Sequence, residues 1–211
     1  FKLDVKEISL FLETNSSQIN YREIIIPTKN IKVYINFVSL IKSKPQIEKI
    51  SLILNQLNTE QIKKISSTLK PSNFTSFLQN KIKNGKINTE LEVYLGDNNL
   101  FENFIARGSV KDLKADLLTD LKLKKFNFKF FADKSDILIK NVFGDFENIE
   151  ISEGDIKLNL ENGIKLNTNF NSKLNFENKD LNKYSKFFNK NEFLNYISNL
   201  KANFNNNLSF N

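Results

Sequence analysis

The feature that most constrains this fold is a strict two-residue alternation on either side of Asn162 and Gly163. From Ile156 to Phe176 the even-numbered positions are mostly apolar, while the odd-numbered positions are Lys, Asn or Glu apart from the turn. A period of two places one set on each face of a β-strand. The Asn-Gly pair favours the positive φ angles of a tight hairpin turn. The pattern therefore predicts two antiparallel strands with both apolar rows on one face of a sheet.

The second of these strands is unusually long. Residues 164–176 alternate for thirteen positions without Gly or Pro, which at ~3.4 Å per residue spans roughly 40 Å. Strands of globular proteins typically have about five or six residues. Long sheets with one apolar face occur in barrels, in sandwiches with extended strands and in open curved grooves that hold an apolar ligand. The alternation predicts the sheet and leaves these architectures open.

The period changes to that of a helix between two alternating regions. Apolar residues at helical spacing predict one helix that starts at Asn58 or Thr59 and ends before Pro71, and a second that Ser72 caps. Gly85 stands where a left-handed C-terminal cap of the second helix is expected.

These patterns predict a mainly β fold with α (β-rich α+β). We expect a long antiparallel meander that forms a curved sheet or groove, with a helix pair near 59–83 and a helical segment near 180–200. Residues 1–211 are expected to form one elongated β-groove-like domain with the helix pair inserted, and a further unit to start after about 200. Because the chain has no Met, begins at Phe1 and stops within a strand-like run, we expect a fragment of a longer protein.

The composition removes most catalytic chemistry. The chain has no Cys and no His, so it lacks thiolate nucleophiles and the commonest general base and metal ligand. Three carboxylates near the centre of the chain, Asp133, Asp136 and Asp145, have no partner base or nucleophile in the sequence. We therefore expect a protein that is not an enzyme and that has no cofactor and no metal site.

Two charged groups suggest binding, and each also has a simpler explanation. The acidic group is Glu147, Glu150, Glu153 and Asp155. Its spacing is not that of a calcium loop, which favours a solvated turn. The basic group is Lys122, Lys124, Lys125 and Lys129. It forms either a positive rim for anionic head groups or an ordinary solvated face, and the formal net charge of +7 only weakly favours an anionic partner.

The aromatic residues argue against nucleic-acid binding. Phe126, Phe128 and Phe130 alternate with Lys125 and Lys129, so the rings and the cations fall on opposite faces of a strand. Base stacking needs exposed aromatics with cations on the same face. We expect no nucleic-acid partner.

Three segments have the pattern of a repeating β unit: residues 83–87 (Lys-Asn-Gly-Lys-Ile), 104–115, which contains Gly-Ser-Val-Lys-Asp-Leu-Lys-Ala, and 149–156. Together with the order of strand, helix pair and meander, they resemble the AsmA-like envelope proteins, especially the large branch that includes YhdP and TamB relatives in Gram-negative bacteria. The similarity covers roughly residues 20–176. It consists of short sequence patterns typical of repeating β units and includes no catalytic signature.

The resemblance implies a periplasmic protein that is anchored in the inner membrane by a segment outside this sequence. It further implies a repeating β-groove whose apolar lining carries phospholipid acyl chains toward the outer membrane. On this interpretation the partners are phospholipid and the membrane, with other envelope proteins as further candidates. No run of the sequence approaches the ~20 apolar residues of a membrane-spanning helix.

The candidate groove residues are the apolar members of the alternating strands. They are Phe126, Phe128, Phe130, Ile156, Leu158, Leu160, Ile164, Leu166, Phe170, Leu174 and Phe176. The same rows are also compatible with an ordinary core packed against the helices. The leading hypothesis is a non-enzymatic lipid-conducting segment. The alternative is a structural or assembly module of the envelope that docks partner proteins through its sheet edges, and a self-contained barrel is the third hypothesis.

Overall fold

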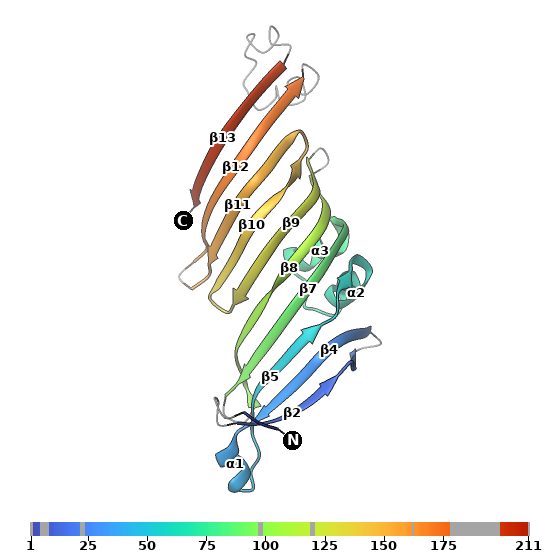
Figure 1. Ribbon diagram of the computed structural model, residues 1–211, viewed down its shortest axis with the longest axis vertical. Coiled ribbons are helices and arrows are strands. Elements are labelled where there is room, and N and C mark those ends of the chain that lie inside the picture. Colours follow the sequence, from blue (N-terminus) through green and yellow to red (C-terminus); the bar gives the residue numbers. More distant parts are fainter. Residues whose placement is uncertain are drawn as a thin grey trace.

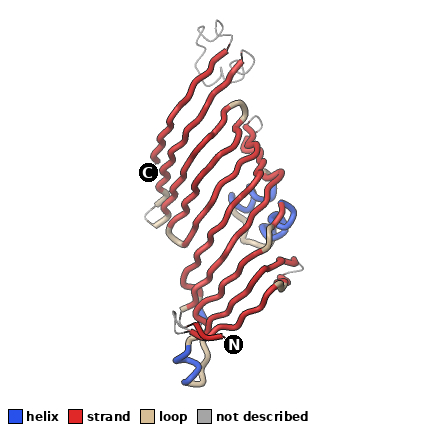
Figure 2. Tube along the Cα trace, viewed as in Figure 1, coloured by secondary structure: helices blue, strands red, loops and turns tan. Residues whose placement is uncertain are grey.

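The computed structural model describes residues 2–4, 9–21, 24–96, 99–118, 121–161, 163–177 and 199–210. Within these ranges thirteen strands form one sheet, and eleven of them follow one another in the order β1-β2-β4-β5-β7-β8-β9-β10-β11-β12-β13. Each pairing along this path is antiparallel. Figures 1 and 2 show the strands side by side along the long axis of the molecule, with the helices beside the sheet or at its end.

The strands of the first half are β1 (Lys2–Asp4), β2 (Ser9–Asn15), β3 (Gln18–Tyr21), β4 (Ile24–Ile35), β5 (Ile47–Leu54) and β6 (Leu57–Asn58). Those of the second half are β7 (Ile82–Leu95), β8 (Phe101–Leu118), β9 (Leu121–Asp133), β10 (Asp136–Phe146), β11 (Ile149–Asn159), β12 (Lys165–Glu177) and β13 (Asn199–Phe210). The helices are α1 (Phe37–Ile41), α2 (Thr59–Ser67) and α3 (Asn73–Asn80). The predicted mainly β fold with an inserted helix pair is confirmed.

The helix pair begins where the polar caps predict. The Asn58 side chain accepts a hydrogen bond from the Gln61 backbone N–H at 3.0 Å, and the Ser72 hydroxyl accepts one from the Thr75 N–H at 3.1 Å. Both caps are reciprocated by the side chain at the third helical position, so each helix has a complete capping box. α2 packs against β4, β6 and β7, and α3 packs against α2 and β7.

The end of the second helix was predicted wrongly. α3 ends at the C-cap Lys81, and the chain enters β7 at Ile82, so Gly85 lies inside a strand. Ile82 pairs with Ala115 of β8, and both side chains are buried. Pairing with β8 leaves Ile82 6% and Ala115 1% exposed, and this apolar burial favours the strand over a further helical turn.

The long hairpin is confirmed, with a wider connection than predicted. β11 and β12 are antiparallel, with Leu158 opposite Leu166. The strands stop at Asn159 and resume at Lys165, so the turn is longer than the Asn-Gly pair alone. Of the helical segment expected near 180–200, residues 178–198 lie outside the described residues. Its last two residues, Asn199 and Leu200, belong to β13 and so form part of a strand and not of a helix.

Three neighbouring strands carry a bulge at a residue other than Gly with positive φ. These residues are Asp112 in β8, Lys125 in β9 and Asn141 in β10, with φ between 53° and 55°. The pairing register shifts at each of these positions. Side chains of adjacent strands bond to two of the bulges: the Asp112 N–H donates to Asn127 Oδ1 at 3.0 Å, and the Asn141 N–H donates to Asp155 Oδ1 at 3.2 Å. Because a bulge bends its strand, three in a row fold the middle of the sheet along one line.

Aromatic rings lie over glycines of the neighbouring strand. Phe130 covers Gly108 and Phe170 covers Gly154, each directly opposite in the register. Phe126 covers Gly144 in the same way, at 2.8 Å from the place where a Cβ would stand. The missing side chain lets each ring lie along the sheet, which shields the glycine backbone from water.

We predict that Gly154→Ala lowers the free energy of unfolding by about 1–3 kcal/mol, because the added methyl overlaps the Phe170 ring. Urea denaturation followed by circular dichroism measures the change. The matched control is Gly96→Ala, whose methyl meets nothing closer than Glu102 Oε2 at 3.6 Å and should be nearly neutral. Equal effects of the two substitutions would contradict the proposed packing.

Candidate binding face

One side of the sheet is apolar from β2 to β13, and we call it the apolar face. The pairing register carries its rows from strand to strand, for example from Ile50 in β5 to Val93 in β7 and from Leu91 to Ala106 in β8. In β2 to β7 it consists of Leu10, Leu12, Ile31, Val33, Ile35, Ile50, Leu52, Ile87, Leu91 and Val93. In β8 to β10 it consists of Ala106, Val110, Leu113, Phe126, Phe128, Phe130, Ile137, Ile139 and Val142. In β11 to β13 it consists of Ile151, Ile156, Leu158, Leu166, Phe170, Leu174, Phe176, Ala202, Phe204, Leu208 and Phe210.

Most of the residues predicted from the sequence lie on this face. They are Phe126, Phe128 and Phe130 in β9, Ile156 and Leu158 in β11, and Leu166, Phe170, Leu174 and Phe176 in β12. The other two, Leu160 and Ile164, lie between β11 and β12 and are 39% and 65% exposed. The structure therefore brings nine of the predicted residues together and leaves these two at the strand ends.

The sequence analysis missed the contribution of β10 and of the first half of the sheet to the same face. In β10 the bulge at Asn141 moves Val142 onto the face that Ile137 and Ile139 occupy. Simple alternation along β10 would place Val142 on the opposite side, because Val142 is three residues after Ile139. Asn141 could have indicated the bulge, because Asn adopts positive φ more readily than most residues. Asn is so common in this chain, however, that this signal is not distinctive.

Among the described residues, no second layer of structure covers the apolar face along β8 to β13. Many of its side chains are half-buried, and only a few, including Phe126 and Phe176, are fully buried. The main contacts of α2 and α3 with the sheet are to β4, β6 and β7. The accessible surface of the chain is 14515 Å², whereas a compact monomer of this mass exposes about 10,000 Å².

Polar groups enter the apolar face near β13, where they bond to one another. Asn206 lies opposite Phe170, and its amide donates to the Ser172 hydroxyl at 2.9 Å and to the Phe170 carbonyl at 3.4 Å. Ser172 is buried. None of the rows that define the apolar face contains a charged side chain in the described strands, so the face can accept an apolar ligand without desolvating an ion.

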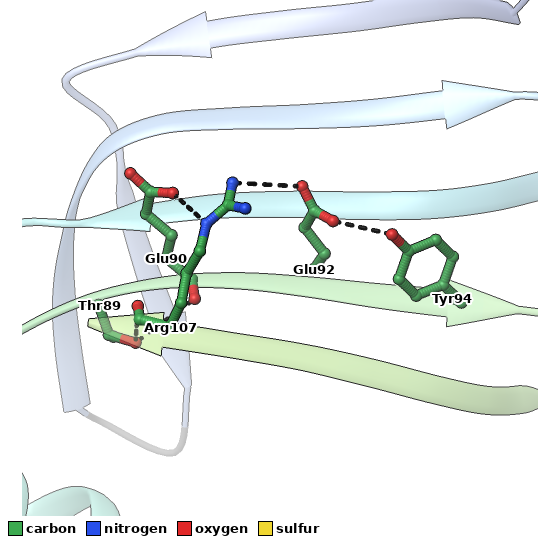
Figure 3. Close-up of polar contacts among 5 residues, drawn as sticks. All are labelled: Thr89, Glu90, Glu92, Tyr94 and Arg107. Atoms are coloured by element: carbon green, nitrogen blue, oxygen red, sulfur yellow. Dashed lines mark hydrogen bonds and ion pairs between the residues drawn. The ribbon is translucent and has the colours of Figure 1, made fainter. Parts of the chain in front are cut away.

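The opposite side of the sheet, the polar face, carries cross-strand ion pairs. Arg107 of β8 places its Nε 2.7 Å from a Glu90 carboxylate oxygen, and its Nη2 lies 3.9 Å from Glu92 of the same strand β7. The Tyr94 hydroxyl donates to the Glu92 carboxylate at 2.8 Å, which extends the row (Figure 3). The hydrogen bond and the charge of Glu90 raise the pKa of Arg107 above its ordinary value.

A second polar cluster joins β2 to β4 on the same face. Glu13 accepts hydrogen bonds from Lys2 and from the Asn30 amide, the latter at 2.8 Å. These two contacts, with the charge of Lys32, hold the pKa of Glu13 below its ordinary value. Nearby, Phe11 and Tyr34 pack with their ring centroids 5.4 Å apart. Cross-strand hydrogen bonds and ring contacts therefore link β1, β2 and β4 on this face.

The acidic group of the sequence falls on strands and a turn, where its members meet cations and donors. Asp155 pairs with Lys140 at 3.1 Å, and Glu150 lies 3.9 Å from Lys173. Glu147 accepts a hydrogen bond from the Lys122 N–H at 2.9 Å. In the part of the chain that the structure describes, no three His, Cys, Asp or Glu residues are grouped so as to hold a metal ion.

The basic group of the sequence has exposed side chains at all four positions. Lys129 lies opposite Lys140 in the register, and Lys124 lies opposite Asp145. Lys129 lines an open hollow together with Glu90 and Arg107, and Lys125 lines another with Asp112 and Asp145.

No helix of the described residues is both long enough and apolar enough to cross a membrane.

The chain matches no protein-family model, no curated protein and no solved structure. The resemblance to the AsmA-like envelope proteins therefore stays a prediction that rests on the three segments quoted above.

We predict that Arg107→Ala lowers the free energy of unfolding by less than ~1 kcal/mol, because the side chain is 55% exposed and solvent screens its ion pairs. The difference should shrink further at high salt. Thermal denaturation at low and high ionic strength tests this. A loss of several kcal/mol would mean that the ion-pair row, and not the strand ladder, holds β7 to β8.

Proposed function

We propose that this chain is a non-enzymatic lipid-binding and lipid-transport segment of a cell-envelope protein, and that its apolar face carries phospholipid acyl chains. The observation that supports the proposal is the continuity of that face across ten strands, from β2 to β13, while the described helices α2 and α3 pack mainly against β4, β6 and β7. Exposed apolar patches of more than a few hundred Å² are rare on soluble monomers and usually mark a binding surface.

The dimensions suit extended acyl chains. Adjacent strands are ~4.8 Å apart, so nine steps from β2 to β13 give a path of roughly 43 Å. An acyl chain on this path crosses several strands, and each CH₂ that leaves water contributes about 0.8 kcal/mol. The head group stays in water at the strand ends, because none of the rows of the apolar face offers a charged partner.

The mechanism that follows is passive. One row of apolar side chains is much like the next, for example Leu158 opposite Leu166 and Ile139 opposite Ile156. A chain that slides from strand to strand therefore exchanges similar contacts and meets no deep energy well. A concentration difference or a partner at one end gives direction. In line with the AsmA-like resemblance, we place the segment in the periplasm between the inner and outer membranes, anchored to the inner membrane by a segment outside this sequence.

A second candidate function is that of a structural module that docks envelope proteins through its sheet edges. The observation in its favour is β13, which pairs with β12 over twelve residues and has no partner on its other edge among the described strands. An open edge of this length is a template for strand addition.

We predict that phospholipid co-purifies with the chain and that Leu166→Asp combined with Phe170→Asp removes it, because two charges on the apolar face penalise acyl-chain contact. Mass spectrometry of organic extracts measures the bound lipid. Circular dichroism should show that the variant keeps its strands.

The matched control places two charges on the polar face of the same strand. Asn167→Asp and Asn175→Asp each introduce an acid opposite a lysine, Lys157 and Lys201 respectively, and should leave the bound lipid unchanged. If the wild-type chain carries no lipid and the apolar-face variant unfolds, the face is ordinary core and the docking function is favoured.

A further inference from the structure

A short excursion between β4 and β5 projects from one end of the long axis of the molecule (Figure 1). It contains α1, in which Phe37, Val38, Leu40 and Ile41 are 42%, 55%, 40% and 68% exposed. Four large apolar side chains on one helical turn are therefore in contact with water. In a typical surface helix such residues face the core. In α1 they face the solvent instead, an orientation that we call inverted.

The inversion is built into the hydrogen bonds of the segment. Asn36 caps α1 by accepting from the Ser39 N–H at 2.7 Å, and the Ser39 hydroxyl accepts from the Gln46 N–H at 2.9 Å. Ser39 is only 7% exposed, and the Asn36 amide bonds to Glu48. The polar side chains thus close the base of the excursion, while the apolar ones are held outward.

The connection between β7 and β8 adds two more exposed apolar residues at the same end. Leu100 is 68% exposed and Phe101 is 57% exposed. The preceding residue, Asn99, accepts a hydrogen bond from the Ile47 N–H at 3.1 Å, which ties this connection to the start of β5. We call the six residues Phe37, Val38, Leu40, Ile41, Leu100 and Phe101 the apolar tip.

Lysines adjoin the apolar tip. Lys42 and Lys44 follow α1 directly, and both are exposed. The acidic side chains described nearby are Glu48, which bonds to Asn36, and Glu102, which lies against Gly96. An apolar surface bordered by exposed lysines is suited to a lipid–water interface. There, apolar side chains enter the acyl region and lysines contact anionic head groups.

We propose that the apolar tip inserts into the surface of a bilayer that contains anionic lipid. The tip lies at the extremity of an elongated molecule, where a planar surface can reach all of it. It is also small, whereas stable protein interfaces bury about 800 Å² or more on each partner. The inference does not depend on the proposed function, because the tip residues differ from those of the apolar face.

The experiment is co-sedimentation of the purified chain with vesicles of phosphatidylcholine alone and of phosphatidylcholine with phosphatidylglycerol. Binding is expected to be stronger to the anionic vesicles. Val38→Asp combined with Ile41→Asp should weaken it at least about tenfold, since two apolar contacts are lost and two negative charges are added. Lys42→Gln combined with Lys44→Gln should remove most of the preference for phosphatidylglycerol.

The matched control is Leu69→Asp combined with Phe74→Asp. These residues are 50% and 65% exposed, close to the values of the tip pair, and they lie beside α2 and in α3. This variant should bind vesicles as the wild type does. Failure of the wild type to bind, or equal losses in the two double variants, would overturn the proposal. So would concentration-dependent dimers in sedimentation velocity that the tip variant abolishes, because the tip would then contact a second copy.

The apolar-face variant Leu166→Asp with Phe170→Asp separates the two proposals. Vesicle binding by this variant together with loss of extracted lipid supports both. Vesicle binding by a wild type that carries no extractable lipid supports the tip and contradicts the lipid-transport function.

Discussion

The antiparallel ladder from β2 to β13 is the interaction on which the rest of the structure depends. The main contacts of α2 and α3 are with β4, β6 and β7, so backbone hydrogen bonds between neighbouring strands carry most of the connection from one end of the sheet to the other. The same ladder fixes the register, and a register error of one residue would move an entire apolar row to the polar face. Continuity of the apolar face is thus a direct consequence of the pairing.

Local features adapt this ladder to a one-sided surface. The bulges at Asp112, Lys125 and Asn141 bend three adjacent strands at one line, and they keep the apolar rows aligned on both sides of the bend. Glycines under Phe130 and Phe170 let aromatic rings lie along the sheet. On the polar face, ion pairs such as Arg107 with Glu90 join the same strands at little net cost or gain. One side is thereby left apolar, and the other carries the cross-strand ion pairs.

The sequence was sufficient for features that depend on local pattern. Alternation around Leu166 predicted β12, and the caps at Asn58 and Ser72 predicted the helix starts. It was insufficient where tertiary pairing decides. Gly85 resembles a helix cap, but the pairing of Ile82 with Ala115 draws the chain into β7. Val142 reaches the apolar face only through a bulge, and the exposure of α1 follows from hydrogen bonds at its base that no periodicity reveals.

The central claim is that an acyl chain lies on the apolar face and not on the polar one. Phe128 and Phe131 test it most directly, because both are in β9 and face opposite sides of the sheet. Each is replaced in turn by photoreactive benzoylphenylalanine, and the chain is irradiated with phospholipid vesicles. We expect lipid adducts at position 128 and few at position 131. Equal yields at the two positions, or adducts only at 131, would contradict it.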